Sequence, residues 1–320
     1  MYLVTGGAGF IGSHLVDHLL ERGDEVVCLD DFNDFYDPAL KRENVQRHRD
    51  YSRYHLVEGD IRDVQLLSTL FDRFDIRRIV HLAARAGVRP SLQQPLLYED
   101  VNVRATIHLL DLARQRKVAQ FVFASSSSVY GGNTKTPFHE DDRISRTVSP
   151  YAATKYAGEL MCYTYHHLYG IPATCLRFFT VYGPRQRPEM AIHKFTRLIY
   201  EGKPIPFFGN GETSRDYTYI DDIIQGVAGA IDHPYDFEVF NLGESFCVTL
   251  SELVRLLEET SGRKVRLEEL PPQPGDVEIT YADISKARQM LHYQPHTPLA
   301  DGLKKFIQWF ERRNTNSLHP

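Results

Sequence analysis

Short apolar segments alternate with longer amphipathic segments along the first 180 residues of the chain. The apolar segments have the length of buried strands, and the segments between them repeat their apolar residues at helical spacing. Alternation of this kind predicts an α/β fold with a Rossmann-type, doubly wound parallel sheet. We expect strands at residues 2–5, 25–30, 54–58, 78–82, 120–125 and 172–177, and helices at 11–22, 64–73, 101–116 and 151–169.

The pattern changes after about residue 180, where prolines divide the chain into shorter elements. Helices are still expected at residues 249–260 and 299–312. We therefore predict a dinucleotide-binding domain over residues 1–180 and a smaller C-terminal α/β domain over residues 181–320, with some segments returning to the first domain. The smaller domain would pack over the carboxyl edge of the sheet. The prolines and one glycine that mark these loops are Pro184, Pro188, Pro204, Pro206, Pro271, Pro272, Pro274 and Gly275.

Composition is that of an ordinary globular protein and argues against several classes of function. Of the 320 residues 42% are hydrophobic and 25% are charged, and the net charge of -5 offers no basic surface to nucleic acid. We see no apolar run of roughly 18 residues and no signal peptide before the first strand, so we expect a cytoplasmic protein that does not bind a membrane. The cysteines lack metal-ligand spacing, so we expect no metal and reduced, buried thiols at Cys28, Cys162, Cys175 and Cys247.

A glycine-rich turn follows the first expected strand and opens the first expected helix. Gly6, Gly9 and Gly12 have the spacing of the dinucleotide-binding fingerprint. In that fingerprint the first glycine allows a tight turn, the second lets the backbone approach a pyrophosphate, and the third lets helix and strand pack closely. The pyrophosphate would then meet free amides at the positive end of the helix.

An acidic residue at the end of the second expected strand indicates which dinucleotide is bound. Asp30 stands where a carboxylate accepts hydrogen bonds from the adenosine ribose hydroxyls and repels the 2′-phosphate of NADP. Asp31 is adjacent, and the sequence alone leaves it open as the ribose partner. The sequence therefore predicts NAD as the cofactor.

Tyr151 and Lys155 lie four residues apart, and so on one face of the helix expected at residues 151–169. A phenol normally titrates near ~10. A nearby ammonium and a positively charged nicotinamide ring would both favour the phenolate. This pair would therefore provide a base at working pH.

A run of four serines, Ser125 to Ser128, follows an apolar strand at the edge where doubly wound folds bind their ligands. A hydroxyl group at this edge can both donate to and accept from a substrate oxygen. Chemistry alone does not distinguish one serine of the run from its neighbours.

With the glycine turn, the serine run and the Tyr151/Lys155 pair identified, the chain resembles the extended short-chain dehydrogenase/reductases of the NAD-dependent epimerase/dehydratase family. More narrowly, it is similar over nearly its whole length to the UDP-glucuronate 4-epimerases. The segment 187–191, Arg-Pro-Glu-Met-Ala, is the one most particular to the enzymes that act on uronates. The other matching segments are residues 29–38, 59–63, 81–89, 177–184, 215–217 and 275–277.

This resemblance implies a role for several individual residues. Ser126, four positions before Tyr130, would be the catalytic hydroxyl beside Tyr151 and Lys155, and Lys155 would also bind the nicotinamide ribose. Relatives often carry arginine at the position of Gln273, so a pyrophosphate contact from that position is in doubt. Further cofactor contacts would come from Phe10, Ile11, Asn33, Asp60, Ile61, Leu82, Ala83, Ala84 and Asn102, and contacts to the UDP-sugar from Arg89, Arg215 and Asp276.

The reaction that we expect is inversion of C4 of UDP-glucuronate through a 4-keto intermediate. Resembling 4,6-dehydratases carry an Asp-Glu pair after the catalytic hydroxyl, and resembling UDP-glucuronate decarboxylases carry a glutamate two positions after it. Here those positions are Ser127 and Ser128, which do not ionise. They would instead hold the sugar carboxylate together with Thr180, and Arg187 would supply positive charge nearby.

Three alternatives remain open. A UDP-glucose/UDP-galactose 4-epimerase would differ in what surrounds C6, and a UDP-glucuronate decarboxylase would lose the carboxylate. A non-catalytic NAD-binding regulator would use the same fold without chemistry, although the intact Tyr151, Lys155 and Ser126 argue against it. The resemblance further implies a homodimer formed through the helices at residues 101–116 and 151–169.

Overall fold

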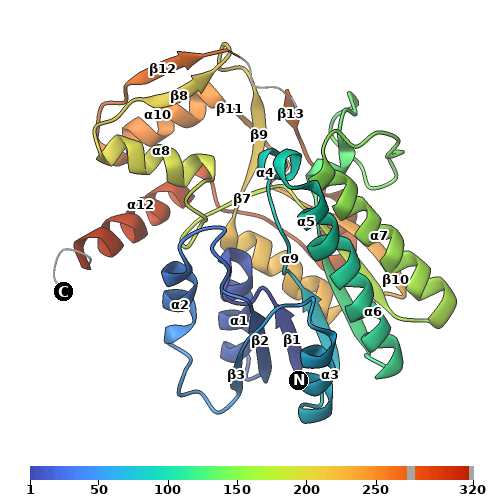
Figure 1. The fold of residues 1–320 in the computed structure, drawn as a ribbon. Coiled ribbons are helices and arrows are strands. Elements are labelled where there is room, and N and C mark those ends of the chain that lie inside the picture. The colour runs from blue at the N-terminus through green and yellow to red at the C-terminus, as the bar shows by residue number, and fades with distance from the viewer. Residues whose placement is uncertain (272–277, 317–320) are drawn as a thin grey trace.

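A parallel sheet of seven strands forms the centre of the larger domain (Figure 1). The structure is a computed structural model that describes residues 1–271 and 278–316. The strand order is β10-β6-β5-β4-β1-β2-β3, and every neighbouring pair is parallel. The strands are β1 (Tyr2–Thr5), β2 (Val26–Asp30), β3 (Tyr54–Glu58), β4 (Arg78–His81), β5 (Gln120–Ser126), β6 (Ala173–Phe178) and β10 (Phe237–Leu242).

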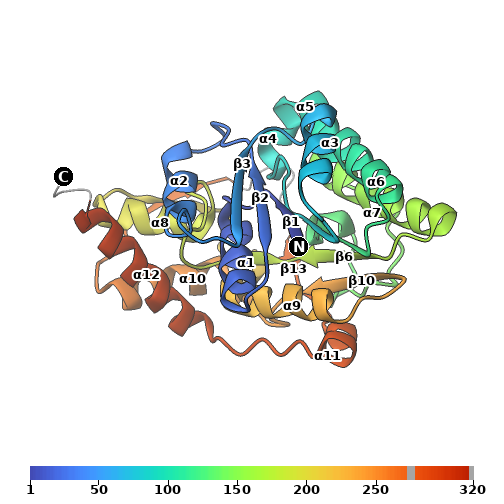
Figure 2. The ribbon, with the colours of Figure 1, turned by 90° about the horizontal axis from the view of Figure 1, so that it is seen from below.

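Helices cover both faces of this sheet (Figure 2). Successive side chains of a strand point to opposite faces. Accordingly, Leu3 packs with α3 (Val64–Arg73), α6 (Ala105–Gln115) and α7 (Pro150–Tyr169), whereas its neighbour Val4 packs with α1 (Phe10–Glu21) and α9 (Ile220–Asp232). The larger domain therefore has three layers. Its further helical segments are α2 (Pro38–Gln46), α4 (Val88–Gln93), α5 (Pro95–Glu99), the π-helical turn η1 (Asp100–Arg104) and the 3₁₀ turn η2 (Ser127–Tyr130).

The strand order reverses between β1 and β4. From β1 the chain moves outward through β2 to β3, and from β4 it moves in the other direction through β5 to β6. Open α/β sheets bind their ligands in the crevice at the carboxyl ends of the strands on either side of such a reversal. This topology places the glycine turn after β1, the loop after β4 and the serines at the end of β5 around one crevice.

The smaller domain lies beyond the carboxyl edge of the large sheet, on the side away from the N-terminus (Figure 1). One of its sheets consists of β7 (Thr180–Tyr182), β9 (Ser214–Tyr219), β11 (Cys247–Thr249) and β13 (Ile279–Thr280), and the other pairs β8 (Ile205–Phe208) with β12 (Leu267–Leu270). The remaining helices are α8 (Ala191–Tyr200), α10 (Leu250–Ser261), α11 (Ser285–Leu291) and α12 (Leu299–Asn316).

The expected strands and long helices are confirmed, with end shifts of a residue or two at several of them, and α12 continues to Asn316 instead of ending at residue 312. The helix expected at residues 101–116 divides into the π-helical turn η1 and α6. Two elements from the second half of the chain, α9 and β10, belong to the layers of the large sheet. Within residues 1–271 and 278–316, no helix is long and apolar enough to cross a membrane.

Candidate active site

The glycine turn packs tightly between β1, α1 and the loop that follows β4. Gly6 has a φ of 68°, and a Cβ at this position would lie 2.7 Å from the amide nitrogen of Ala83. A Cβ on Gly12 would lie 2.1 Å from the carbonyl oxygen of Gly6, so neither position accepts a side chain. Helix α1 begins after Gly9 without a side-chain cap, which leaves the amides of its first turn available to an anion.

Asp30 ends β2 with its carboxylate buried beside this turn. The carboxylate accepts hydrogen bonds from the amides of Ala8 and Phe32, at 3.2 and 2.9 Å, and Lys41 Nζ lies 3.3 Å away. Burial raises the pKa of Asp30, and the positive charge of Lys41 opposes that rise. Asp31 is more exposed and lies 3.7 Å from the same ammonium. Asp30 and Asp31, either of which could bind the ribose according to the sequence, therefore share the ammonium of Lys41.

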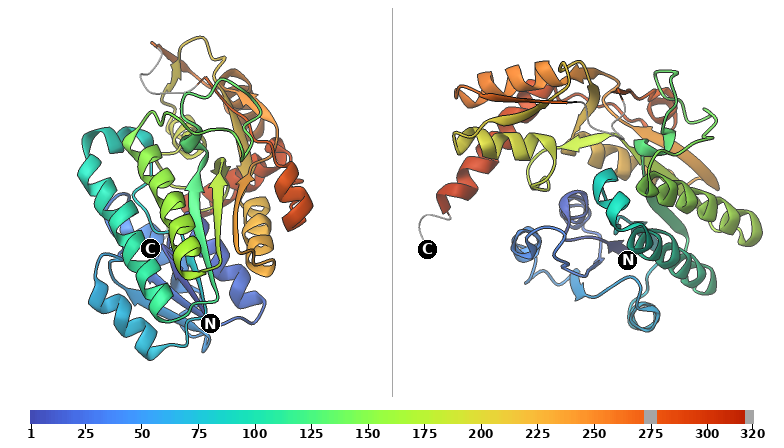
Figure 3. Two further views of the ribbon diagram at one scale, coloured as in Figure 1. Left: turned by 90° about the vertical axis from the view of Figure 1, so that its right-hand side faces the viewer. Right: turned by 45° about the horizontal axis from the view of Figure 1, so that its top comes forward.

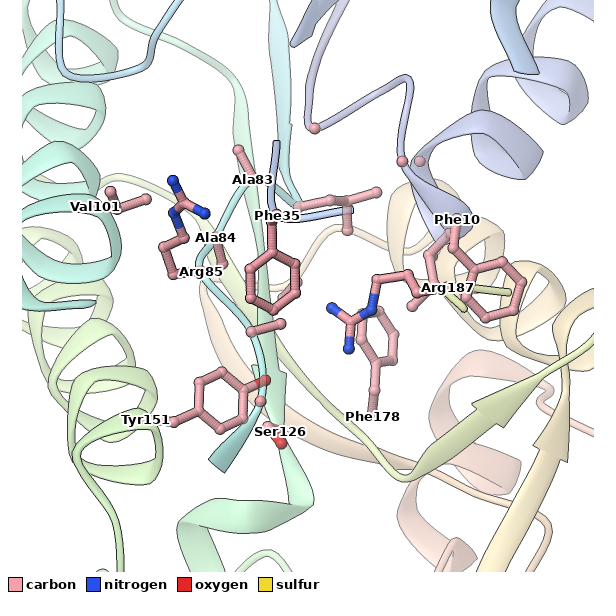
Figure 4. A pocket seen from close by; sticks show the side chains of 18 of the residues that line it. Phe10, Phe35, Ala83, Ala84, Arg85, Val101, Ser126, Tyr151, Phe178 and Arg187 are labelled. Carbon is pink, nitrogen blue, oxygen red and sulfur yellow. The ribbon is translucent and has the colours of Figure 1, made fainter. Parts of the chain in front are cut away.

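A single cleft brings together most of the residues that the sequence singled out. It extends from the glycine turn, past the ends of β2, β3 and β4, to the end of β5 and the start of α7. Figure 4 shows part of this lining from close by. The predicted site residues that line the cleft are Gly6, Gly9, Phe10, Ile11, Gly12, Asp30, Asn33, Asp60, Ile61, Leu82, Ala83, Ala84, Ser126, Ser127, Ser128, Tyr151, Lys155, Thr180 and Arg187.

Tyr151 lies in the first turn of α7, where Ser149 caps the helix by accepting a hydrogen bond from the amide of Ala152 at 3.1 Å. The hydroxyl of Tyr151 points toward Ser126 (Figure 4). Burial raises the pKa of Tyr151, whereas the hydrogen bond from Ser126 and the positive charge of Arg187 lower it. The groups that favour the phenolate in this structure are therefore Ser126 and Arg187.

Lys155 lies one helical turn after Tyr151, but its ammonium is engaged elsewhere. Nζ donates a hydrogen bond of 2.7 Å to the carbonyl oxygen of Ala124 and lies 5.1 Å from the centre of the Phe123 ring. Burial lowers the pKa of Lys155 to about 8. The ammonium thus holds α7 against β5, and it is not among the groups that shift the pKa of Tyr151. The prediction that this ammonium lowers the pKa of Tyr151 is not reproduced in this structure, where Ser126 and Arg187 lower it instead.

The structure separates the serines that chemistry alone could not distinguish. Ser125 donates its hydroxyl hydrogen to the carboxylate of Glu159, beneath the cleft floor. Ser126 Oγ accepts from the amide of Ser128 at 3.2 Å and hydrogen-bonds with Tyr151. Ser127 and Ser128 form the 3₁₀ turn that follows. Among the four, Ser126 is therefore the one whose hydroxyl meets the phenol.

Arg187 and Thr180 approach the same cleft from the smaller domain. Thr180 begins β7, which pairs with β9. Arg187 Nε lies 2.9 Å from a carboxylate oxygen of Glu189, and its guanidinium lies 5.7 Å from the centre of the Phe35 ring. A second guanidinium, that of Arg85, lies 5.7 Å from the same ring, so Phe35 stands between two cations (Figure 4).

Three of the predicted residues that the structure describes lie outside the lining of this cleft. Asn102 is buried behind the cleft wall, where its amide bonds both the N–H and the C=O of Arg85, at 2.8 and 2.9 Å. Arg89 lies on α4 with its guanidinium 5.7 Å from the Phe208 ring centre, and Arg215 lies on β9 and donates to backbone carbonyls. Asp276, like Gln273, falls outside the described residues.

Several cleft residues were not predicted. Phe35, Tyr36 and Lys41 come from or follow the matching segment 29–38, and Phe178 and Phe179 come from the segment 177–184. Their segments were recognised, but sequence does not show which side chains of a loop turn inward. Arg85 likewise lies inside the segment 81–89. Within the described residues, no cluster of three or more His, Cys, Asp or Glu side chains could hold a metal.

Comparison with known proteins agrees with this geometry. The family model for GDP-mannose 4,6 dehydratase matches residues 3–306. The chain is 43% identical to a UDP-glucuronate 4-epimerase of Thermodesulfobacterium geofontis over 96% of this chain and 95% of that protein. The fold matches the UDP-glucuronic acid 4-epimerase of Bacillus cereus, solved with UDP-glucuronic acid and NAD, with a TM-score of 0.91 and 38% identity over 98% of this chain and 99% of that one.

A UDP-glucose 4-epimerase of Thermotoga maritima, solved with UDP-glucose, is also similar, with a TM-score of 0.90 and 33% identity over 98% of this chain and 99% of that one. The matched family model spans nearly the whole chain, and the curated relative covers both domains. The chain therefore belongs to the NAD-dependent epimerase/dehydratase family to which the GDP-mannose 4,6 dehydratase model refers.

Proposed function

We propose that the protein is an NAD-dependent epimerase that inverts C4 of a UDP-sugar, and that its substrate is UDP-glucuronate. The observation that carries the proposal is the position of Arg187 in the same cleft as the Tyr151/Ser126 pair, close enough for its charge to lower the pKa of the phenol. A guanidinium beside the reacting centre suits a sugar that carries a carboxylate. The relatives and structures named for UDP-glucuronate support the same choice.

The residues at the turn after β1 fit NAD. The uncapped start of α1 offers amides to a pyrophosphate, the glycine positions accept no Cβ, and Asp30 and Asp31 present carboxylates where the adenosine ribose would lie. Bound NAD would accept a hydride from C4 and could return it to the opposite face of the sugar. It would also place a positive charge beside the phenol. Lys155, which lines the same cleft, would hold the nicotinamide ribose.

The proton chemistry belongs to Tyr151 and Ser126. As phenolate, Tyr151 accepts the proton of the 4-hydroxyl when C4 is oxidised, and returns it when C4 is reduced. The Ser126 hydroxyl stabilises the phenolate by hydrogen bonding and can bond the same sugar oxygen. Between the two half-reactions the 4-keto sugar must turn over about its bond to the phosphate, so that its other face meets the cofactor.

The carboxylate makes the 4-keto sugar a β-keto acid, which loses carbon dioxide most easily when the bond to the carboxylate stands perpendicular to the carbonyl plane. An epimerase must therefore hold the carboxylate away from that direction. Thr180, Ser127 and Ser128 offer hydroxyl groups in the cleft and Arg187 offers charge. Replacing Thr180 with valine should raise the yield of UDP-pentose relative to UDP-galacturonate, and an unchanged ratio would remove Thr180 from this role.

A product assay tests the proposed function directly. The purified protein with NAD is incubated with UDP-glucuronate or with UDP-glucose, and the products are followed by NMR. We expect UDP-galacturonate from the first substrate. A UDP-pentose as main product would mean a decarboxylase, turnover of UDP-glucose alone would mean a hexose epimerase, and turnover of neither would leave a binding protein.

The assembly and location that we propose also have structural support. Apolar side chains are exposed along α5 and α7, among them Leu96, at 81% exposure, Leu160 and Tyr163. Helices α6 and α7 lie side by side on one outer flank (Figure 3, left), and we propose that two copies pair through this flank, with α5 and α7 contributing its exposed apolar side chains. Cys162 and Cys175 hydrogen-bond with each other as free thiols, which suits a reducing compartment such as the cytoplasm.

A further inference from the structure

A buried carboxylate on α1 collects three partners from two other parts of the chain. Asp17, on the second turn of the helix, is 7% exposed. Arg47 Nε, at the end of α2, donates to it at 3.0 Å, and His48 Nε2 lies 2.6 Å from the same oxygen. Arg185 Nη1 lies 2.8 Å from the other oxygen. These partners keep the pKa of Asp17 low although burial alone would raise it.

The partner from the smaller domain, Arg185, belongs to the loop of residues 183–190 that joins β7 to α8. The backbone of Arg185 is left-handed, with a φ of 66°, a conformation that residues other than glycine rarely adopt. The neighbouring carbonyl oxygen of Pro184 lies 3.0 Å from His14 Nε2, and His14 is also on α1. Two successive residues of the loop are thus attached to the helix whose first turn faces the pyrophosphate site.

The next residue of the loop is attached to the smaller domain. Gln186 is buried, and its side-chain amide donates to the carbonyl oxygen of Val181 at 3.0 Å and accepts from the amide of His193 at 3.1 Å. His193 Nδ1 lies 2.6 Å from the carbonyl oxygen of Gln186. The residue that follows these fixed positions is Arg187, whose guanidinium enters the cleft.

We propose that Asp17 is a positioning residue for the substrate: by binding Arg185 it fixes loop 183–190 against α1, and so directs Arg187 toward the sugar carboxylate. Helix α1, whose first turn would bind the cofactor phosphates, then also sets the position of Arg187, which would bind the sugar carboxylate. One rigid helix, α1, would thereby set the distance between the site where C4 is oxidised and the group that binds the carboxylate. This inference rests on the carboxylate-binding role proposed for Arg187.

The pair is better explained by geometry than by stability. A buried ion pair loses hydration free energy that its attraction only partly offsets, so it is weak evidence of a stabilising role. Arg185 also holds an unfavourable backbone conformation. What the loop gains from these two residues is a close contact between opposite charges, at 2.8 Å, that attaches it to α1.

The test compares two ligands that differ at C6 alone. In NAD-loaded protein, the dissociation constants of UDP-glucuronate and UDP-glucose are measured by calorimetry for Asp17→Asn, Arg185→Gln and Arg187→Gln. Because a misplaced Arg187 would lose part of a charge-assisted hydrogen bond to the sugar carboxylate, we expect UDP-glucuronate binding to weaken by about tenfold in the first two variants. UDP-glucose binding should change less than about twofold, and Arg185→Lys, which keeps the charge, should recover part of the loss.

Asp232→Asn is the matched control, because Asp232 binds Arg22 at the other end of α1, at 2.9 Å, with both groups exposed. It should leave both dissociation constants unchanged. NAD binding and thermal unfolding are recorded for every variant, and Arg185→Gln carries the test should Asp17→Asn not fold. Equal weakening of both ligands by Asp17→Asn or Arg185→Gln would overturn the inference, since that pattern means a general structural effect.

The outcomes separate this inference from the proposed function. If Arg187→Gln weakens UDP-glucuronate selectively while the Asp17 and Arg185 variants do not, Arg187 keeps its role and Asp17 loses the one proposed here. If Arg187→Gln leaves the ratio of the two dissociation constants unchanged, the carboxylate-binding role itself is wrong, and the inference is overturned with it.

Discussion

The ammonium of Lys155 donates its hydrogen bond to the carbonyl oxygen of Ala124, at 2.7 Å, and so joins α7 to β5 two residues before Ser126. The phenol of Tyr151 is carried by the same helix, and the hydroxyl that meets it is carried by the same strand. The lysine therefore fixes the spacing between the two groups that we propose to handle the proton. This is a structural role, independent of any effect on acidity.

Replacing Tyr151 with phenylalanine should abolish epimerisation while leaving the cofactor bound. The ring still fills its place against Tyr98, whose centre is 6.3 Å away, but the group that accepts the proton is gone. A loss of about 10²- to 10⁴-fold in kcat is typical of removing such a group. Product NMR and NAD titration together check this. Activity within about tenfold of the unchanged protein would show that another residue is the base.

Removing the Ser126 hydroxyl should shift the pH dependence of the reaction. Burial raises the pKa of Tyr151, and the hydrogen bond from Ser126 opposes that rise. In Ser126→Ala the pKa should therefore be higher, and the ascending limb of kcat/KM should move to higher pH, because the phenolate is the active form. The measurement is kcat/KM for UDP-glucuronate between about pH 6 and 10.

Ser128→Ala is the comparison for this measurement. Ser128 bonds Ser126 but is not among the groups that shift the pKa of Tyr151. Its replacement should leave the position of the limb unchanged, whatever it does to the rate. A limb that stays in place in Ser126→Ala would mean that the observed ionisation belongs to another group.

The cofactor preference should depend on Asp30 and, in the opposite direction, on Lys41. Replacing Asp30 with serine removes a carboxylate that would repel the 2′-phosphate of NADP, so NAD should lose affinity relative to NADP by roughly tenfold. Lys41 lies 3.3 Å from Asp30 and compensates its charge. Lys41→Met should therefore increase the preference for NAD. Fluorescence titrations with both dinucleotides measure the ratio.

Asp31→Ser decides between the two carboxylates that the sequence left open. Asp31 lines the same cleft and accepts a hydrogen bond from the amide of Asn33. A larger change of preference in Asp31→Ser than in Asp30→Ser would assign the ribose contact to Asp31. An unchanged preference in both variants would mean that the selection against the 2′-phosphate lies elsewhere.

The hydrophobic pattern of the sequence predicted those helices and strands whose own residues show the periodicity of the element. The strands β1 and β3 and the helix α3 have the bounds that their periodicity gave. Helix α2 was not predicted, because only Lys41 and Val45 among its residues are buried and its apolar stripe is correspondingly weak. Strand β10 was not predicted as part of the large sheet, because its partner β6 lies far earlier in the chain.

The same limit applies to the candidate site. The glycine turn and the Tyr151/Lys155 pair are local motifs, so sequence identified them. Which serine meets Tyr151 depends on Glu159, which takes the hydroxyl of Ser125. The position of Phe35 between two arginines depends on loops from three parts of the chain. Contacts of this kind are set by tertiary packing, which a linear motif does not encode.

Placing a charge among the exposed apolar side chains of α5 and α7 should dissociate the proposed dimer. Leu160, on α7, is 48% exposed, and an arginine there would place a charge between the two copies, which a desolvated interface disfavours. In sedimentation velocity, Leu160→Arg should shift the protein to the monomer at concentrations where the unchanged protein is dimeric. Val64→Arg on α3, where the apolar residue is 46% exposed, should have no such effect. A monomeric unchanged protein would contradict the assembly.

The folded protein should lose stability in mild acid, because it holds three histidines in their neutral form. Burial lowers the pKa of His81 to about 3 and those of His14 and His193 to about 4, from 6.5. Below pH 6.5 the unfolded chain binds protons at these positions that the folded chain does not. The free energy of unfolding should therefore fall as the pH falls from about 6.5 toward 4, by about 1.4 kcal/mol per pH unit for each histidine. Urea unfolding at several pH values measures this slope, and His193→Gln should reduce it by one histidine's share; an unreduced slope would show that His193 is protonated in the folded protein.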